Sequence, residues 1–380
     1  MIGYSNDTDG VFARYLSIPC MPVRRWKTNH HKKNPYFYLI SYNNFNKIDY
    51  IPKKIIKLAK TYKRFYIVLN NSFEGYAYMN FQFIYDFVKE HGLEKKVVYI
   101  CGHYYTEQEY NYWCKINNFK NTYHAVSYNV FFDSTRDGYI HGNTTFSVEK
   151  TKWFCCLNHR PHVHRLAAVT YMDYLDILES GLVTCHDKPY EVGTLETEYD
   201  SFDESIKYLK NIVEPKYYEI LKTQSVKTKQ KLPLVYDIHD LTNACQPMDF
   251  NPDIYDTCLI NLVTETFYTN HWNYYSEMFI TEKTIKPIMS NQIFIIIGPQ
   301  GILKKLKEFG YRTFGDFFDE SYDELSDKTR VFKAIETLNH VMSTYDISDL
   351  ELRTREIRAH NLEIFKQNKF NINLETRLGI

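Results

Sequence analysis

The sequence has no excess charge of either sign and no long hydrophobic run. Its 380 residues include 46 lysines and arginines and 46 aspartates and glutamates, so the formal net charge is zero. A neutral chain has no overall field that draws it to nucleic acid or to a membrane, although a local basic patch could still do so. Residues 1–10 are polar, and no apolar run approaches the length of a membrane span. We therefore expect a cytoplasmic protein without a membrane anchor.

Motifs that bind metals, nucleoside triphosphates or dinucleotides are also missing. The eight cysteines form no C-x-x-C pair, and the adjacent Cys155 and Cys156 lie in an apolar run that suits buried thiols in a reducing compartment. Neither a Walker A loop nor a G-x-G-x-x-G run occurs, which argues against NTPases and dehydrogenases. His159, His162 and His164 are closely spaced, but no cysteine or acid nearby in sequence completes a metal site. We therefore expect no metal site.

The first part of the chain alternates apolar segments with helical ones. The predicted strands are residues 36–41, 64–70, 97–102 and 122–131. The predicted helices are residues 53–61, residues 78–90 and a segment that begins at Thr106, where Thr106 and Glu109 have the spacing of a capping box. Strands that alternate with helices predict a parallel sheet with helices on both faces.

A polar segment that contains glycines, residues 133–145, separates this series from a second one. The predicted elements of the second series are strands at residues 152–156, 258–265 and 293–297, and helices at residues 161–178, 328–343 and 351–366. Gly181 is expected to close the first of these helices, and residues 227–233 to form a charged bridge. We predict two α/β domains, residues 1–145 and residues 146–380.

The most informative segment is MFITEKTIKPIMSNQIFIIIGP, residues 278–299. Thr281 is a typical N-cap residue, and Glu282 and Lys283 follow it in the first turn of a short helix that Pro287 interrupts. Free N–H groups at a helix N-terminus favour anions, while a carboxylate accepts hydrogen bonds from hydroxyls. A solvated helix start is the alternative, but a short, interrupted helix ahead of a buried strand favours a site that holds a sugar and a phosphate together.

A second polar segment, NHRPHVHR at residues 158–165, lies between a predicted strand and a predicted helix. Ligands of open α/β sheets bind outside the carboxyl ends of the strands. Arg160 and Arg165 carry permanent charge and forked donors that fit phosphate oxygens. We predict phosphate binding here rather than a solvated loop. Glu265, at the end of another apolar strand, is a predicted acceptor for ligand hydroxyls.

Both segments resemble the donor-binding domain of GT-B glycosyltransferases, most of all fucosyltransferase-like and phage or giant-virus enzymes. The similar residues are F-I-T-E-K at 279–283 with Pro287 and the strand up to Gly298, and the run N-x-R-P-x-x-x-R that begins at Asn158. The resemblance covers much of residues 151–330, and residues 1–150 carry no motif of the family. It implies two Rossmann-like domains that face each other across a cleft, with a terminal helix that crosses back to the first domain.

The resemblance also implies roles for the site residues. Glu282 would bind ribose or sugar hydroxyls and Lys283 the phosphates, while Asn158, Arg160, Arg165, Glu265 and Thr281 complete the donor site. The implied activity is that of a hexosyl- or pentosyltransferase, which moves a sugar from a UDP- or GDP-linked donor to a hydroxyl acceptor. The nucleotide sugar is then a substrate, and no cofactor is expected.

The mechanism is expected to be independent of metal. It is also expected to be inverting, because Glu265, Glu277 and Glu282 do not have the E-x7-E spacing of retaining enzymes. An inverting transferase needs one base that deprotonates the acceptor. In GT-B enzymes this base usually comes from the first domain, where we consider Glu74, Asp9 and His103. Asp7 and Asp9 also form a D-x-D, but it precedes every predicted strand inside a turn-like segment, so we predict a turn rather than a metal site.

A basic cluster near the N-terminus suggests an acceptor. The cluster consists of Arg24, Arg25, Trp26, Lys27, Lys32 and Lys33. If the acceptor is a hydroxylated base in viral DNA rather than a glycan, these cations could bind the phosphates and Trp26 could stack on a base, in the cytoplasm of a host. A solvated loop is the alternative for this segment. For the whole chain the alternative is a non-catalytic nucleic-acid-binding protein with a vestigial transferase fold.

Overall fold

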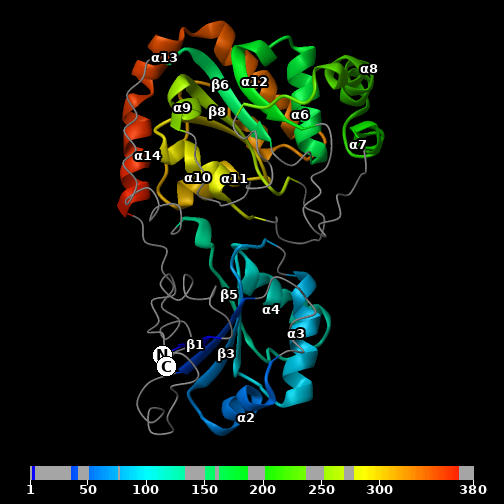
Figure 1. Ribbon diagram of the computed structural model, residues 1–380, viewed down its shortest axis with the longest axis vertical. Coiled ribbons are helices and arrows are strands. Elements are labelled where there is room, and N and C mark those ends of the chain that lie inside the picture. Colours follow the sequence, from blue (N-terminus) through cyan, green and yellow to red (C-terminus); the bar gives the residue numbers. More distant parts are fainter. Residues whose placement is uncertain are drawn as a thin grey trace. The chain divides into compact units, whose positions relative to one another are not determined.

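The computed structural model describes residues 2–4, 36–41, 51–75, 78–132, 150–158, 162–186, 202–236, 252–268 and 278–367. It contains two parallel β-sheets with helices packed against them (Figure 1), which confirms the predicted α/β fold class. Of the described residues, those up to Phe132 form one compact unit together with Met278 and Phe279, and the others form a second unit. The predicted domain limits and a terminal helix that crosses back stay predictions.

The first unit is built on a five-stranded parallel sheet with the strand order β1-β2-β3-β4-β5. The strands are β1 (Ile2–Tyr4), β2 (Tyr36–Ser41), β3 (Phe65–Asn71), β4 (Val97–Cys101) and β5 (His124–Ser127). The helices are α2 (Lys53–Thr61), α3 (Tyr78–His91) and α4 (Thr106–Ile116). Every residue of β3 and β4 is buried, as expected for strands whose two faces are both covered.

Strand β1 was not predicted, and β5 is shorter than the strand predicted at residues 122–131. The predicted capping box is also wrong, because Tyr105 is the N-cap of α4 and makes no side-chain cap bond. The hydroxyl of Thr106 instead donates to the carbonyl of His103 at 2.7 Å. That bond ties the first residue of α4 to the loop after β4.

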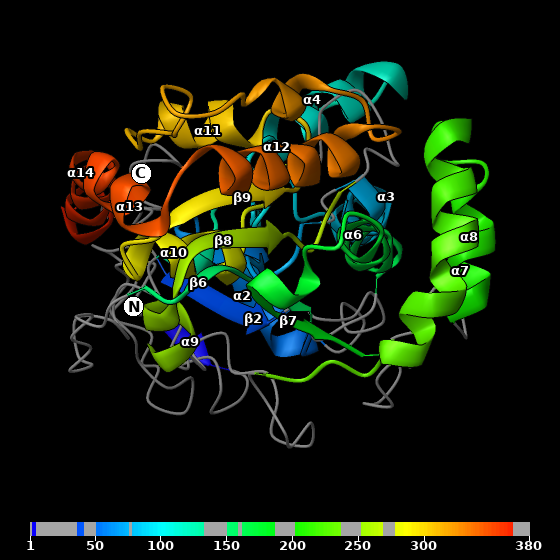
Figure 2. The ribbon, with the colours of Figure 1, turned by 90° about the horizontal axis from the view of Figure 1, so that it is seen from above.

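The second unit is built on a four-stranded parallel sheet with the strand order β7-β6-β8-β9. The strands are β6 (Lys152–Asn158), β7 (Gly181–Cys185), β8 (Cys258–Thr264) and β9 (Ile293–Ile297). The α-helices are α6 (Val163–Tyr174), α7 (Phe202–Leu209), α8 (Pro215–Lys231), α9 (Pro252–Thr257), α10 (Glu282–Met289), α11 (Ile302–Glu308), α12 (Arg330–Thr344), α13 (Ile347–Arg353) and α14 (Arg355–Gln367). Helices α6 and α12 pack on each other and on the sheet, while α10 packs on β8, β9 and α14 (Figure 2).

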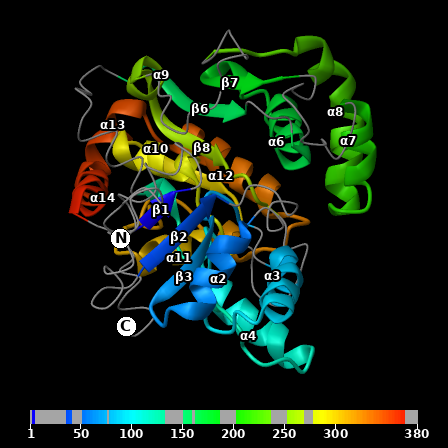
Figure 3. The same cartoon turned by 60° about the horizontal axis from the view of Figure 1, so that its bottom comes forward.

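Three predictions in this unit were wrong. The single helix predicted at residues 351–366 is two helices, α13 and α14, which are separated at Thr354. Helix α6 ends at Tyr174, because Asp176 takes the left-handed conformation that stops a helix, with φ of 59°. Gly181 does not cap it but begins β7. Residues 227–231 belong to α8 rather than to a bridge, and α7 and α8 pack beside α6 (Figure 3).

A buried carboxylate holds α8 against α6. Asp173 accepts hydrogen bonds from Gln224 (2.8 Å), Thr228 (2.6 Å) and Lys231 (2.6 Å). Bonds from three residues of one helix to a single acid on another fix the register of the two helices. Within the described ranges, no helix is long and apolar enough to cross a membrane.

Candidate active site

The strand order of the second sheet reverses between β6 and β8. The chain passes from β6 to β7 on one side and then places β8 on the opposite side of β6. In open α/β sheets, ligands bind outside the carboxyl ends of the strands at such a switch point. Strand β6 ends at Asn158 and β8 ends at Thr264, so these two positions define where a ligand site is expected.

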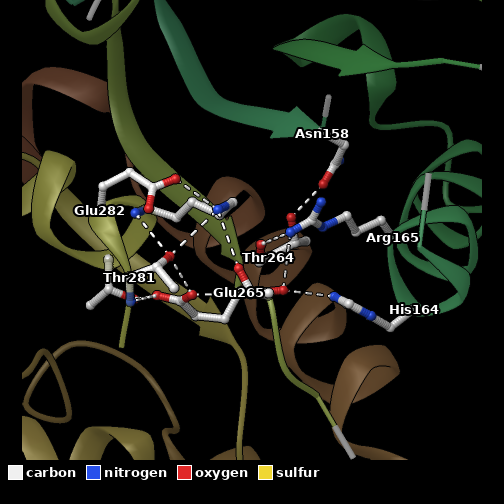
Figure 4. A network of polar contacts seen from close by, with 10 residues as sticks. Asn158, His164, Arg165, Thr264, Glu265, Thr281 and Glu282 are labelled. Atoms are coloured by element: carbon white, nitrogen blue, oxygen red, sulfur yellow. Dashed lines mark hydrogen bonds and ion pairs between the residues drawn. The ribbon is translucent and has the colours of Figure 1, made fainter. Parts of the chain in front are cut away.

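A continuous network of polar side chains lies at this switch point (Figure 4). We call it the switch-point network, and its members are Asn158, His164, Arg165, Thr264, Glu265, Thr266, Thr281, Glu282, Lys283 and Thr284. They come from the end of β6, the first turn of α6, the end of β8 and the first turn of α10. Thus two segments that are more than a hundred residues apart in sequence meet at one edge of the sheet.

The first turn of α10 supplies the part of the network that is best suited to bind an anion. Thr281 is its N-cap, as predicted, and the hydroxyl oxygen of Thr281 accepts from the amide of Lys283 at 3.3 Å. The other amides of a first turn have no intrahelical acceptor, and the helix dipole adds partial positive charge at this end. A phosphate placed here would find both donors and a favourable field.

Lys283 and Glu282 form an ion pair at the start of this helix. Lys283 Nζ lies 2.8 Å from Glu282 Oε1 and 3.4 Å from the hydroxyl of Thr266. The two side chains keep 28% and 16% of their surface exposed, so solvent and ligands can reach them. Burial opposes ionisation of Glu282, but the charges of Lys283 and Lys286 outweigh it and hold the pKa of Glu282 below its ordinary value. A cation and a carboxylate acceptor therefore lie side by side at neutral pH.

Glu265 occupies the interior of the network and has no exposed surface. Its Oε1 accepts from the amide of Thr281 at 3.0 Å and from the hydroxyl of Thr284 at 2.6 Å. Its Oε2 accepts from the hydroxyl of Thr281 at 2.7 Å and from the amide of Thr266 at 3.0 Å. The carboxylate predicted to accept ligand hydroxyls is thus engaged by the chain itself.

Arg165 and Asn158 are also buried, and both bind the end of β8. Arg165 donates to the main-chain carbonyls of Thr264 and Glu265, each at 3.2 Å. The amide oxygen of Asn158 accepts a hydrogen bond from the hydroxyl of Thr264. These contacts place the Arg165 charge at the switch point, although its guanidinium reaches main-chain carbonyls rather than open solvent.

His164 is half-buried and has a defined tautomer. Its Nε2 lies 2.9 Å from the carbonyl oxygen of Glu265, which can only accept, so Nε2 must carry the hydrogen. Burial, together with the Arg165 charge, lowers the pKa of His164 to about 3, so the ring is neutral at neutral pH. The ring stacks on Tyr268, with centroids 5.3 Å apart, and its Nδ1 is an acceptor.

The structure brings together six of the predicted donor-site residues, Asn158, Arg165, Glu265, Thr281, Glu282 and Lys283. Arg160, the seventh, lies outside the described residues, as do Asp9 and the basic cluster from Arg24 to Lys33. The network also contains residues that were not predicted, which are Thr264, Thr266 and Thr284. His164 was weighed only as a metal ligand. The only sequence signal for these threonines was their position beside the two acids, in the runs T-E-T and T-E-K-T.

The predicted bases Glu74 and His103 belong to the first unit. Glu74 is exposed and follows the end of β3. His103 follows β4 and is buried, its Nδ1 accepting from the amide of Tyr105 at 3.2 Å and lying 3.8 Å from Glu109. Within the described part of the chain, no group of three or more His, Cys, Asp or Glu residues could hold a metal ion.

Comparisons with known proteins add a structural similarity. No protein-family model matches the sequence, and no curated protein matches it. Among solved structures, the chain is similar to an α,α-trehalose-phosphate synthase (UDP-forming) from Burkholderia vietnamiensis, with a TM-score of 0.45 and 8% sequence identity. The similarity covers 90% of this chain and 71% of that one. At this level of likeness the activity of that enzyme does not transfer to this chain.

Proposed function

We propose that this protein is a glycosyltransferase of the GT-B type that uses a nucleotide-sugar donor. The observation that carries the proposal is the pair of partly exposed side chains, Lys283 and Glu282, at the N-terminus of α10 beside the switch point of the second sheet. A cation and helix amides suit a diphosphate, and an ionised carboxylate suits ribose or sugar hydroxyls. The fucosyltransferase-like and viral resemblance of the sequence supports the same class.

The proposed chemistry assigns Lys283 a role in the departure of the nucleotide. As the sugar leaves, negative charge builds on the diphosphate, so a fixed cation stabilises the transition state more than the ground state. In the structure Lys283 is paired with Glu282. On donor binding the ammonium group would turn to the phosphate, which leaves the carboxylate of Glu282 able to accept hydroxyls. The pair therefore suits a ligand that carries both a phosphate and hydroxyl groups.

Arg165 and Asn158 take positioning roles in this proposal. Their side chains are buried and bind the end of β8, so they fix the backbone beside the site, and Arg165 also contributes positive charge there. Arg160 remains the proposed phosphate contact from this segment. The donor sugar is a hexose or a pentose on UDP or GDP, and the reaction is proposed to be inverting and independent of metal.

The base is proposed to be Glu74 of the first unit. Its side chain is exposed, whereas His103 is buried and its Nδ1 already accepts a hydrogen bond from the chain. Asp9 is kept as a second candidate. For the acceptor we propose a hydroxyl group on a glycan or on a modified base of DNA, with the basic cluster from Arg24 to Lys33 as the contact for DNA phosphates.

The test is a thermal-shift screen of the full chain with UDP-, GDP-, CMP- and dTDP-sugars, followed by a turnover assay with any stabilising compound. A ligand that binds the native state raises its stability by mass action. We expect stabilisation by one nucleotide class and hydrolysis or transfer of its sugar, both weakened by Glu282→Ala. Salt-sensitive DNA binding without any turnover would support the nucleic-acid-binding alternative instead.

A further inference from the structure

We infer that Glu265 is a positioning residue, which sets the first turn of α10 against the end of β8 so that Lys283 and Glu282 face the donor. The inference rests on the proposed function, because it concerns the same ligand. It differs from the prediction that Glu265 contacts hydroxyls of the ligand. The observations that carry it are the four hydrogen bonds of the buried carboxylate and the contacts of the same residue's carbonyl.

The carboxylate of Glu265 accepts hydrogen bonds from the N-cap of α10 and from its first turn. Oε1 accepts from the amide of Thr281 and the hydroxyl of Thr284, which lie on either side of Glu282 and Lys283 in sequence. Oε2 accepts from the hydroxyl of Thr281 and the amide of Thr266. One buried side chain therefore bonds to three threonines that surround the ion pair. Charge-assisted hydrogen bonds of this kind are about twice as strong as neutral ones.

One of these bonds also orients the helix cap. Because the hydroxyl of Thr281 donates its hydrogen to Glu265, its lone pairs are left for the amide of Lys283, at 3.3 Å, and for Lys283 Nζ, at 3.5 Å. If the Thr281 hydroxyl donated in another direction, it would lose one of these contacts. The orientation of this hydroxyl, which the bond to Glu265 sets, therefore decides both the helix cap and the contact with the side-chain amine of Lys283.

The main chain of Glu265 connects the helix start to the other half of the site. Its carbonyl oxygen accepts from His164 at 2.9 Å and from Arg165 at 3.2 Å, both in the first turn of α6. The main-chain carbonyl of Glu265 contacts the N-terminus of α6 and its carboxylate contacts the N-terminus of α10, so this residue links the two helix starts. The distance between these two helix starts determines whether they can bind one diphosphate together.

Only a carboxylate can make this set of contacts. The amides of Thr266 and Thr281 are obligatory donors, and each points at a different oxygen of Glu265. A glutamine has the same shape but offers one oxygen and one NH2 group, so a donor would face a donor at one of these amides. Glu265→Gln therefore perturbs the position of α10 with almost no change in side-chain volume.

The experiment compares Glu265→Gln with the wild type in two measurements. The first is hydrogen exchange of the amides in residues 281–285 without ligand, and the second is binding of UDP and GDP by calorimetry. We expect faster exchange in this first turn and nucleoside-diphosphate binding that is weaker by about 10-fold or more, which is a loss of at least about 1.4 kcal/mol of binding free energy. Unchanged exchange and unchanged affinity would overturn the inference.

Asp173→Asn is the matched control, because Asp173 is also a buried acid that accepts several hydrogen bonds in the same unit. It lies between α6 and α8, away from the network. We expect it to lower stability while leaving nucleotide affinity as in the wild type. If it weakens binding as much as Glu265→Gln does, the effect is general destabilisation and the inference fails.

A second pair of variants keeps the inference testable if Glu265→Gln does not fold. Thr284→Val removes one donor to Glu265, while Thr284→Ser retains it. We expect a higher KM for the donor with Thr284→Val and recovery with Thr284→Ser, with the KM of the acceptor unchanged in both. Equal KM values for the two variants would contradict a positioning role. A wild-type protein that is stabilised by none of the UDP-, GDP-, CMP- and dTDP-sugars would instead refute the proposed function, whatever the variants do.

Discussion

Lys283→Met removes a charge from the site while it preserves most of the volume of the side chain. The ammonium group lies 2.8 Å from Glu282 and 3.4 Å from Thr266, so it is already held at the helix start. Two unit charges 4 Å apart interact by about 4 kcal/mol at an effective dielectric constant of 20. Because 28% of the Lys283 side chain is exposed, solvent screens part of this energy.

The expected loss is therefore that of a single preorganised donor, about 2–4 kcal/mol of transition-state stabilisation, or roughly 30- to 1000-fold in kcat. The assay is a single-turnover measurement of sugar transfer or hydrolysis at saturating donor, because this separates the chemical step from donor binding. Lys283→Arg keeps the charge and is expected to retain more activity than Lys283→Met.

The control is Lys366→Met, which removes another lysine that forms an ion pair with a nearby glutamate, at 3.0 Å from Glu363. It lies near the end of α14 and is expected to have wild-type kcat. If Lys283→Met binds the nucleotide sugar and turns it over within about threefold of the wild-type rate, no cation at this position stabilises the leaving group, and the proposed mechanism is wrong.

Three further outcomes are expected. Glu282→Ala should chiefly raise the KM for the nucleotide sugar, since hydroxyl contacts form before the reaction; a fall in kcat alone would contradict this. Glu74→Gln should lower turnover by roughly 10²-fold or more without weakening donor binding, and full activity would remove Glu74 as the base. Burial raises the pKa of Asp323 from 3.8 to about 6, so the folded state binds its proton more tightly than the unfolded state, and stability is lost as pH rises through this window. Asp323→Asn cannot ionise but can still accept hydrogen bonds from the amides of Leu303 and Lys304. In urea unfolding, the free energy of unfolding of Asp323→Asn minus that of the wild type should therefore rise by up to about 3 kcal/mol from pH 4 to pH 7.5. An equal difference at both pH values would show that this carboxyl does not titrate there.

Local sequence signals were sufficient for many elements. The strand Ile293–Ile297 and the start of α10 after Thr281 lie where the apolar run and the N-cap residue placed them. Such signals depend on a residue and its neighbours in the chain, so no tertiary contact is needed to detect them. They failed for β7, a mostly buried strand that pairs with β6, and for the end of α8, where the bonds to Asp173 decide the structure.

The location of the candidate site could also be predicted. Parallel strands end at the same edge of their sheet, so residues that follow different strands, such as Asn158 and Glu265, were expected to come close together. The proposed ligand chemistry follows from the residue types, because cations, acids and a helix N-terminus at one edge suit phosphates and hydroxyls.

What the sequence by itself determined was therefore the fold class and the place of the candidate site. Only the tertiary structure decided which polar groups remain available to a ligand. Glu265 and Lys283 are equally polar in the sequence, yet one is fully buried with four hydrogen bonds from the chain and the other is partly exposed beside a single carboxylate. A buried carboxylate must find its donors within the protein, because leaving it unpaired costs several kcal/mol, and those donors are supplied by threonines on other elements. Since these partners are set by packing and not by the neighbouring residues in the chain, the sequence could not distinguish the buried acid, Glu265, from the partly exposed acid, Glu282, which is proposed to bind the ligand.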